Sequence, residues 1–200
     1  MSSSFKFDLK YAHDISGQSG WRSPSNIALI KYWGKKDVQI PLNTSLSFTL
    51  SNCYTDCIVK HESLKNNNDE CEFVLLFEGK REISFGEKLN TFFKRIVVYC
   101  PYLLSLKLTI DTKNSFPHSS GIASSASAYS AVSLCIMDIE KKLNPEISSE
   151  YFFNKASFLS RLGSGSACRS VLGPLAIWGE SNIFKTSSDL FAVKYEEQLH

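Results

Sequence analysis

The sequence lacks the features that mark membrane proteins, secreted proteins and nucleic-acid-binding proteins. No apolar run approaches the ~20 residues of a membrane-spanning helix. The formal net charge is only +2, so electrostatic attraction to a phosphate backbone or an anionic membrane is weak. The N-terminal residues are rich in serine and carry charges, unlike the apolar core of a secretory signal. We therefore expect a cytoplasmic protein with small-molecule partners, no nucleic acid and no membrane, and a homodimer stays open.

Closely spaced metal ligands are also scarce. Of the six cysteines, only Cys53 and Cys57 lie near each other, and no second pair follows. The four histidines never occur at the spacing of metal ligands. The cysteines are therefore interpreted as reduced cytoplasmic thiols, and Cys135, in an apolar stretch, as a residue of the core.

What is present is the composition of a globular domain, with 43% hydrophobic residues in a chain of 200. Strand-like patterns occur at residues 27–30, 46–50, 57–61, 72–77, 82–84, 106–110, 172–178 and 190–195. Helical patterns cover 87–100 and 122–143, and a further helix is expected after Ser148 or Ser149, which are suitable N-caps. Strands that come first and helices that cluster later indicate the α+β fold class.

Small and hydroxylated residues are concentrated in a loop before the second predicted helix. The loop comprises Pro117, His118, Ser119, Ser120, Gly121, Ile122, Ala123, Ser124 and Ser125. Small side chains let a ligand approach the backbone, and the start of a helix attracts phosphate. The hydroxyls of Ser124 and Ser125 suit phosphate or a phosphate-bound Mg²⁺. No Gly-Lys-Ser/Thr follows, so this is not a Walker A loop, and an ordinary serine-capped helix is the alternative.

A second loop combines glycine and serine with a single arginine. Residues Gly163–Ser170 read Gly-Ser-Gly-Ser-Ala-Cys-Arg-Ser. The planar guanidinium of Arg169 suits bidentate binding of a carboxylate or a phosphate, and Ser164 and Ser166 suit a second anionic group. A flexible connector with a solvated arginine is the alternative.

Lysines and aromatic residues lie side by side after the first predicted strand. Lys31 and Lys35 flank Tyr32, Trp33 and Gly34. An exposed basic run is the commoner meaning of such lysines, but the aromatic residues and the glycine favour an anion pocket. Together with the two loops, this segment indicates a substrate with several anionic groups.

These three segments resemble known motifs. The Pro-x3-Gly-Ile-Ala-Ser-Ser-Ala loop resembles the ATP-binding motif of the GHMP superfamily of small-molecule kinases. Ile30–Lys35, Pro41–Ser45 and Gly163–Ser170 are similar to motifs of the diphosphomevalonate decarboxylase family, and the resemblance extends from Trp21 to Glu180. It implies a GHMP N-terminal domain, similar to domain 2 of ribosomal protein S5, with helices packed on one face of a mixed or antiparallel sheet.

The resemblance also implies a reaction. Such enzymes use ATP and Mg²⁺ to phosphorylate the 3-hydroxyl of (R)-5-diphosphomevalonate. Loss of phosphate and CO2 then gives isopentenyl diphosphate, in the mevalonate pathway of isoprenoid biosynthesis. We expect a loosely ordered leader at 1–20 and the ATP- and substrate-binding domain at 21–185. Residues 186–200 are expected to begin a strand or connection toward a C-terminal half that is largely absent from this chain.

Individual positions take their expected roles from the same resemblance. Arg169 corresponds to the arginine that contacts the substrate carboxylate, Lys31 to the lysine near the reacting hydroxyl, and Ser125 to the serine near the ATP phosphates and Mg²⁺. These three are the expected catalytic residues, and Ser125 is also the expected metal ligand. The expected substrate-binding residues are Tyr32, Trp33, Gly34, Lys35, Lys88, Ser164, Gly165, Ser166, Ala167, Cys168 and Arg169. The loop from Pro117 to Ser125 is expected to bind ATP.

One expected element is missing, and two other functions stay open. The catalytic aspartate of the family belongs to a later Asp-Ala-Gly-Pro-Asn segment, and no such string occurs in these 200 residues, so the catalytic set is incomplete here. A GHMP kinase that phosphorylates mevalonate or its phosphate without decarboxylation shares the ATP loop but usually differs at 163–170. A non-catalytic binding module similar to ribosomal protein S5 is disfavoured by the near-neutral charge.

Overall fold

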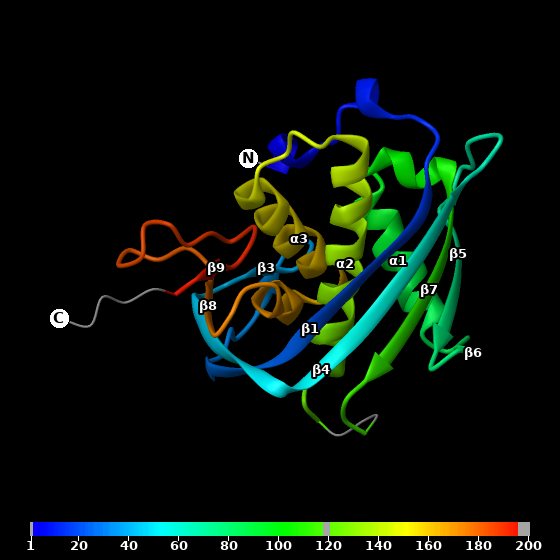
Figure 1. Cartoon of the computed structure of the whole chain (residues 1–200). Helices are drawn as coiled ribbons and strands as arrows, with labels where there is room; N and C mark the ends of the chain where they lie inside the picture. The colour runs from blue at the N-terminus through cyan, green and yellow to red at the C-terminus, as the bar shows by residue number, and fades with distance from the viewer. Residues whose placement is uncertain (1, 118–120, 196–200) are drawn as a thin grey trace.

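The computed structural model describes residues 2–117 and 121–195, and it contains one main sheet covered by helices (Figure 1). The strands are β1 (Ser16–Ile30), β2 (Lys35–Lys36), β3 (Ile40–Pro41), β4 (Ser45–Ser63), β5 (Glu72–Phe77), β6 (Lys80–Arg81), β7 (Leu106–Asn114), β8 (Leu175–Trp178) and β9 (Val193–Lys194). The α-helices are α1 (Gly86–Ile96), α2 (Ser124–Leu143) and α3 (Ser149–Gly163). The 3-10 helices are η1 (Ser2–Phe5), η2 (Leu9–Tyr11), η3 (Pro101–Ser105) and η4 (Gly165–Ser170).

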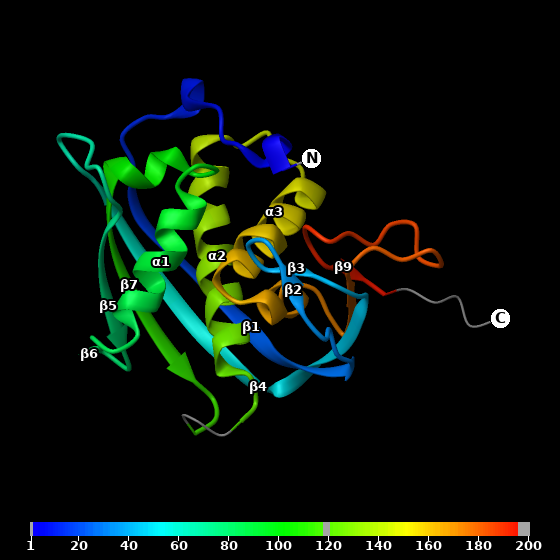
Figure 2. The ribbon, with the colours of Figure 1, turned by 180° about the vertical axis from the view of Figure 1, so that it is seen from behind.

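The main sheet is mixed. Its strand order is β6-β5-β7-β4-β8-β9, and β1 pairs with β4 outside this path. β5 and β7 run parallel, whereas the other paired strands run antiparallel. β2 and β3 form a separate hairpin. The α-helices lie on one face of the sheet in both ribbon views (Figures 1 and 2), which confirms the expected α+β class.

β4 is the central strand, because it pairs with β1, β7 and β8. Side chains such as Thr55 and Val59 point from it toward the helices and are fully buried. The sequence pattern predicted two short strands here, at 46–50 and 57–61. The polar residues between them interrupt the apolar alternation, but the Thr55 hydroxyl donates to Asn114 Oδ1 at 2.8 Å, so the strand continues without leaving that polar group unpaired.

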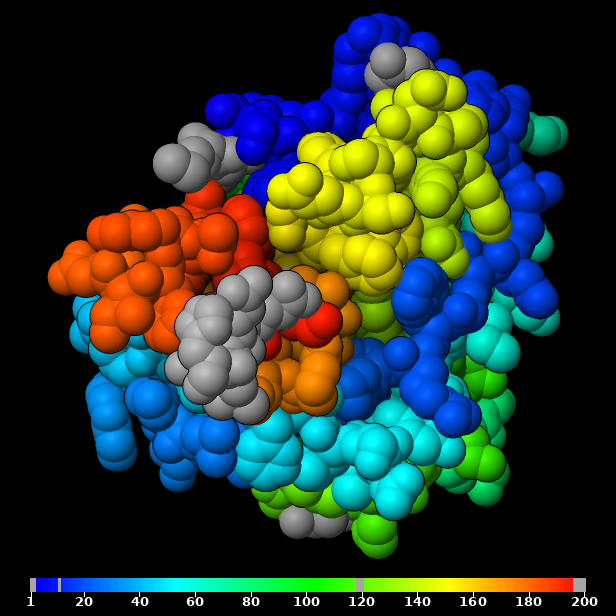
Figure 3. All heavy atoms as spheres, turned by 60° about the vertical axis from the view of Figure 1, so that its left-hand side comes forward, coloured from blue at the N-terminus to red at the C-terminus, as the bar shows by residue number. Residues whose placement is uncertain are grey.

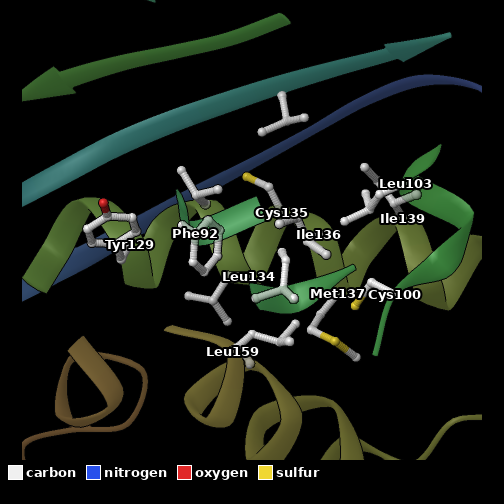
Figure 4. Packing of buried hydrophobic residues seen from close by; sticks show 14 of the residues in the cluster. Phe92, Cys100, Leu103, Tyr129, Leu134, Cys135, Ile136, Met137, Ile139 and Leu159 are labelled. Atoms are coloured by element: carbon white, nitrogen blue, oxygen red, sulfur yellow. The ribbon is translucent and has the colours of Figure 1, made fainter. Parts of the chain in front are cut away.

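α2 lies at the centre of the core, between the sheet and the helices α1 and α3. The consecutive residues Leu134, Cys135 and Ile136 are all buried, so no side of this helix segment faces solvent. Figure 4 shows these side chains gathered with Phe92 of α1 and Leu159 of α3. The prediction that Cys135 belongs to the core is confirmed.

Local capping and turn chemistry set two of the element boundaries. Ser148 caps α3 as expected, because its hydroxyl accepts a hydrogen bond from a backbone N–H in the first turn at 3.1 Å. A strand was expected at 82–84, but the hairpin of β5 and β6 ends before it. The turn residues Glu78 and Gly79 have positive φ values of 52° and 75°, which fits the tight connection between these strands.

The N-terminal segment packs against the rest of the domain, which differs from the loose leader expected for residues 1–20. The Phe5 ring lies 4.9 Å from the ring of Phe158 on α3, and the Phe7 ring lies 4.9 Å from that of Tyr102. Both phenylalanines are buried, and β1 begins within the same segment. Two aromatic side chains supply enough contact area to hold a polar segment against the core. The sequence-based prediction missed this packing because the segment contains few aliphatic residues.

An ion pair is buried between α2 and α3. The Lys155 ammonium lies 2.8 and 2.6 Å from the two carboxylate oxygens of Glu140, and both side chains are almost fully buried. Lys155 also donates to the backbone carbonyl of Tyr99 at 3.2 Å. Each charge is tolerated in the interior because the other neutralises it, since an isolated buried charge is very unfavourable.

Removing one partner of this pair should destabilise the fold. We expect Lys155→Met to lower the free energy of unfolding by about 3–5 kcal/mol, because the Glu140 carboxylate then stays buried without a counter-charge. Urea unfolding of both proteins measures the change. The matched control is Lys94→Met, whose pair with Glu70 at 2.8 Å is exposed and should matter little. If the two substitutions lowered the free energy of unfolding equally, burial of the Lys155–Glu140 pair would not be the reason for the loss.

A buried histidine should make the stability depend on pH. His61 on β4 is fully buried, and within the described part of the chain neither ring nitrogen has a hydrogen-bond partner. Burial, and secondarily the charge of Lys142, lowers the pKa of His61 below its ordinary value. The unfolded chain therefore binds more protons at this position than the folded chain. Stability should consequently fall as the pH falls through the ordinary histidine pKa of about 6.5.

The measurement is the free energy of unfolding at pH 7 and at pH 5 for the wild type, His61→Leu and His13→Gln. The loss of stability between the two pH values should be smaller in His61→Leu, because the leucine cannot bind a proton in either state. His13 is exposed, and its substitution should leave the loss unchanged. The same pH dependence in all three proteins would assign the effect to other groups.

Candidate active site

The loop that follows α3 buries an arginine. Arg169, in η4, is only 2% exposed. Its Nη1 donates to the hydroxyl of Ser45 at the start of β4. Its guanidinium carbon lies 5.5 Å from the centre of the Tyr32 ring and 5.8 Å from that of Trp178. The alternative of a flexible connector with a solvated arginine is therefore excluded, and we call these four residues the arginine site.

One donor of Arg169 has no acceptor. Among the residues that the structure describes, its buried Nε meets no hydrogen-bond partner. Burial lowers the pKa of Arg169, with opposing effects from Cys168 and Tyr32, but a guanidinium stays protonated in proteins. A buried cation with an unfilled donor is unfavourable by itself. The arginine site is thus suited to an anionic acceptor, above all a carboxylate.

Cys168 neighbours this arginine but is not suited to react. Its thiol is buried and donates to the carbonyl of Gly165 at 3.0 Å. Burial raises the pKa of Cys168 to about 12, although Arg169 and Arg161 oppose the shift. A thiol that stays protonated at neutral pH is a poor nucleophile. Cys168 and the equally buried Ala167 therefore fill space beneath the loop.

The segment between β1 and β2 forms one wall of the arginine site. The Tyr32 ring packs edge-on against Trp178, with 5.0 Å between the ring centres. Lys35 Nζ lies 5.6 Å from the centre of the Tyr32 ring. The hairpin of β2 and β3 that follows lies next to η4 in Figure 2 and below the projecting segment near residue 185 in Figure 3. An ion pair of 4.0 Å between Lys36 and Asp189 joins that segment to the hairpin.

The same segment is fixed by Asn43. The Asn43 side chain accepts a hydrogen bond from the backbone N–H of Trp33 at 2.8 Å and donates to the carbonyl of Lys31 at 3.0 Å. Gly34 follows Trp33, and a Cβ there would come within 2.7 Å of a methyl carbon of Leu42. The side chains of Lys31 and Trp33 are exposed, Trp33 to 84%. These two side chains are therefore accessible to a ligand or to another chain segment.

The start of α2 is open to a ligand. Its N-cap residue, Ala123, has a φ of 49° and offers no capping side chain, so the serine-capped helix that was the alternative does not form. First-turn N–H groups without a side-chain cap are available to phosphate. The Ser25 hydroxyl of β1 donates to the carbonyl of Ile122 and holds this turn against the sheet.

The rest of the expected ATP loop is only partly described. His118, Ser119 and Ser120 lie outside the described residues. Pro117 and Gly121 flank these three positions, and both are exposed. Gly121 has a φ of 78°, a conformation that glycine adopts without steric cost.

A cavity of about 680 Å³ opens beside the start of α2. Ser124 and Ser125 line it together with Lys88 of α1, and the aromatic rings of Phe85 and Tyr129 contribute apolar surface. Such a lining suits a flat apolar group that carries phosphates. Lys88 thus lies with the expected ATP residues, and none of the contacts described for the arginine site involves it. We call this space the helix-start cavity.

Comparison with known proteins shows which family this chain belongs to. Residues 23–189 match the model of the diphosphomevalonate decarboxylase-like N-terminal domain. The chain belongs to this family. A diphosphomevalonate decarboxylase from Ganoderma lucidum is 31% identical over 191 residues, which cover 89% of this chain and 45% of that protein.

Solved structures of this family are also similar to the chain over about half of their own length. A mevalonate diphosphate decarboxylase from Staphylococcus aureus matches with a TM-score of 0.71 and 32% identity, over 92% of this chain and 52% of that chain. The structure of MDDEF in complex with MVAPP, AMPPCP and magnesium matches with a TM-score of 0.69 and 31% identity, over 92% and 51%. The chain therefore spans about half the length of these relatives.

In this member of the family, β1 joins the loop before α2 to the loop that carries Arg169. Asn26 Nδ2 donates to the carbonyl of Ser166 at 3.0 Å and to the hydroxyl of Ser170 at 2.7 Å, both in η4. The preceding residue, Ser25, holds the start of α2. Adjacent residues of a regular strand point to opposite faces, but the β1–β4 register shifts between Pro24 and Asn26, so both side chains face the helices.

Three residues of this arrangement had no role in the sequence-based prediction. Ser45 stood inside the Pro41–Ser45 motif, Asn26 directly preceded the predicted strand at 27–30, and Trp178 was only the end of a predicted strand. The signal that could have identified them is a polar residue directly before an apolar run, or a tryptophan at the end of a strand. Ser164 and Ser166, which were predicted, are half-buried at the mouth of the loop that carries Arg169.

Two further observations concern the residues at 2–117 and 121–195. They contain no group of three or more histidine, cysteine or acidic residues that could hold a metal ion. They also contain no helix that is both long enough and apolar enough to cross a membrane.

Proposed function

We propose that this chain provides the ATP- and substrate-binding half of an enzyme that converts (R)-5-diphosphomevalonate to isopentenyl diphosphate with ATP. The observation that carries the proposal is the buried Arg169 with its unfilled Nε donor. A carboxylate is the ligand that best satisfies such a group, and the substrate of this reaction carries one. Membership of the diphosphomevalonate decarboxylase-like family supports the same reaction.

The helix-start cavity is the proposed site of ATP. Its apolar and aromatic lining suits a base, and the uncapped start of α2 suits phosphates. The relative MDDEF was solved with AMPPCP and magnesium. We assign the Ser125 hydroxyl to the ATP phosphates and their Mg²⁺, which would neutralise charge on the transferred group. Lys88 lines this cavity, so its proposed partner becomes a nucleotide phosphate rather than the substrate diphosphate.

The arginine site is the proposed site of diphosphomevalonate. Arg169 binds the carboxylate, and Ser164 and Ser166 surround it from the same loop. Lys31 and Lys35 are exposed on the segment between β1 and β2, and we assign them positive charge near the reacting hydroxyl and the diphosphate. This division gives each ligand its own loop, and β1 sets the distance between them.

The proposed chemistry has two steps. The 3-hydroxyl attacks the γ-phosphoryl group of ATP, which yields ADP and a phosphate ester. The C–O bond of that ester then breaks, and the electron pair of the bond to the carboxylate forms the new double bond as CO2 leaves. Arg169 holds the carboxylate in place, but the carboxylate loses its negative charge as it becomes CO2. Arg169 must therefore not stabilise the bound carboxylate much more than the transition state. The hydroxyl proton goes to the family's later aspartate, which these residues do not include.

The domain limits follow the same proposal. Residues 21–185 form the unit that binds both ligands, close to the 23–189 of the family match. We propose that residues 186–200 belong to a connection toward a C-terminal half; their described part, residues 186–195, includes β9.

The reaction is tested by incubating ATP and (R)-5-diphosphomevalonate with a protein that carries the family's later aspartate segment as well as these 200 residues. Release of ADP and CO2 in equal amounts supports decarboxylation. ADP without CO2 would assign a plain kinase, and mevalonate or phosphomevalonate should then be the better substrate. Because the chain spans about half the length of its relatives, calorimetric binding of each ligand to the 200-residue chain is the accompanying measurement. A chain that bound neither ATP nor (R)-5-diphosphomevalonate would refute the proposal.

Ser125→Ala should weaken nucleotide binding selectively. We expect the affinity for Mg-ATP to fall by about 10-fold, as for one lost hydrogen bond to a charged group. The affinity for diphosphomevalonate should change less than about twofold. Titration calorimetry with each ligand measures both values. Ser148→Ala is the control, because it removes a true helix cap and should cost stability without affecting either ligand.

Arg169→Lys should weaken substrate binding selectively. Lysine keeps the charge but loses the planar pair of donors, so we expect the affinity for diphosphomevalonate to fall on the order of 100-fold. The affinity for Mg-ATP should stay nearly constant. Arg22→Lys is the control, because it loses the same planar pair of donors in an exposed pair with Asp56 that belongs to neither site. A lysine variant that binds substrate as well as the wild type would show that Arg169 contributes charge alone.

A further inference from the structure

The turn between β2 and β3 is strained. Asp37 and Gln39 have φ values of 46° and 61°, a left-handed conformation that costs a non-glycine residue roughly 1 kcal/mol or more. Such a turn persists only where its surroundings hold it. Arg161, which is buried at the end of α3, donates through Nη1 to the carbonyl of Val38 at 2.7 Å and through Nε to that of Leu190 at 2.7 Å. The tip of the hairpin is therefore anchored to the core.

This anchored turn directs the Gln39 side chain into the arginine site. A Cβ built on Gly165 would lie 3.2 Å from Gln39 Oε1, 3.3 Å from the Tyr32 hydroxyl and 3.2 Å from the Trp178 ring. The amide oxygen therefore lies above the backbone of η4, beside the same two rings that border Arg169. Glycine at 165 leaves the space in which these groups meet.

The Gln39 oxygen has nothing to accept. Oε1 is buried, and in the part of the chain that the structure describes it has no hydrogen-bond partner. The Nε donor of Arg169 is in the same condition. An unfilled buried acceptor and an unfilled buried donor both raise the free energy of the empty site. A ligand that relieves both must offer an anionic acceptor to Arg169 and a donor to Gln39, as a hydroxy acid does.

We propose that Gln39 is a substrate-binding residue that recognises the hydroxyl of a hydroxy acid whose carboxylate binds Arg169. This inference rests on the proposed function, in which that hydroxyl is the 3-hydroxyl of diphosphomevalonate. When the ligand binds, the amide oxygen accepts a hydrogen bond from this hydroxyl and thereby orients the oxygen that attacks ATP. The proton passes to the family's later aspartate only during that attack. It also discriminates against acids without the hydroxyl, because these leave the buried acceptor unpaired.

The test compares two ligands and two variants. The ligands are (R)-5-diphosphomevalonate and its analogue with hydrogen in place of the 3-hydroxyl. Gln39→Met keeps the length of the side chain and removes the acceptor. Gln39→Asn withdraws the acceptor by one methylene and suits the left-handed turn, because asparagine adopts this conformation more readily. Calorimetry on the 200-residue chain gives the dissociation constants.

The wild type should prefer the hydroxylated ligand by about 10-fold, as expected for one buried hydrogen bond. Both variants should lose most of this preference by weaker binding of diphosphomevalonate, with little change for the deoxy analogue. Val38→Ala, in the same turn, is the control and should keep the wild-type preference. The inference is overturned if the wild type binds the two ligands equally, or if the variants weaken both to the same extent. A wild type that binds neither ligand overturns the proposed function itself.

Discussion

The positions of the loop before α2 and of the loop that carries Arg169 depend on the hydrogen bonds that β1 makes on its helix-facing side. Ser25 holds the carbonyl before α2, and Asn26 holds η4. Because these residues are adjacent, the two loops cannot separate without disturbing the pairing of β1 with β4. The helix start and the guanidinium of Arg169 therefore keep a fixed spacing. Fixed spacing is what a reaction between two bound anions needs, since orientation contributes much of the rate enhancement.

The chain contains two kinds of buried charge with opposite consequences. The Lys155 ammonium and the Glu140 carboxylate neutralise each other, so this part of the core is complete without a ligand. The guanidinium of Arg169 meets the Ser45 hydroxyl and two aromatic rings, and among the described residues its Nε has no hydrogen-bond partner. The fold must hold this guanidinium in place by other contacts, at a cost in stability. Arg169 thus differs from the structural ion pair in one physical respect: it is a buried charge that lacks both a counter-charge and a full set of hydrogen bonds.

The sequence predicts the parts of the site that depend on neighbouring residues. The glycine- and serine-rich loops could be recognised because small residues and hydroxyls next to a helix start have a local chemical meaning. The burial of Arg169 could not be predicted, because Ser45 and Trp178 reach it from distant strands. The packing of Phe5 was missed for the same reason, since its partner ring is on α3. The continuity of β4 also depends on a partner strand, whose Asn114 satisfies a polar residue in the middle of the strand.

The pairing of β4 with β8 has a consequence for the order in which the molecule assembles. The Ser45 hydroxyl bonds to the carbonyl of Trp178, 133 positions later, and to Arg169, 124 positions later. Contacts of such long sequence separation form slowly, because a long loop must close first. During synthesis the first strands and α1 leave the ribosome well before β8 does. The end of the molecule that contains the arginine site is therefore assembled after most of the hydrophobic core has already emerged.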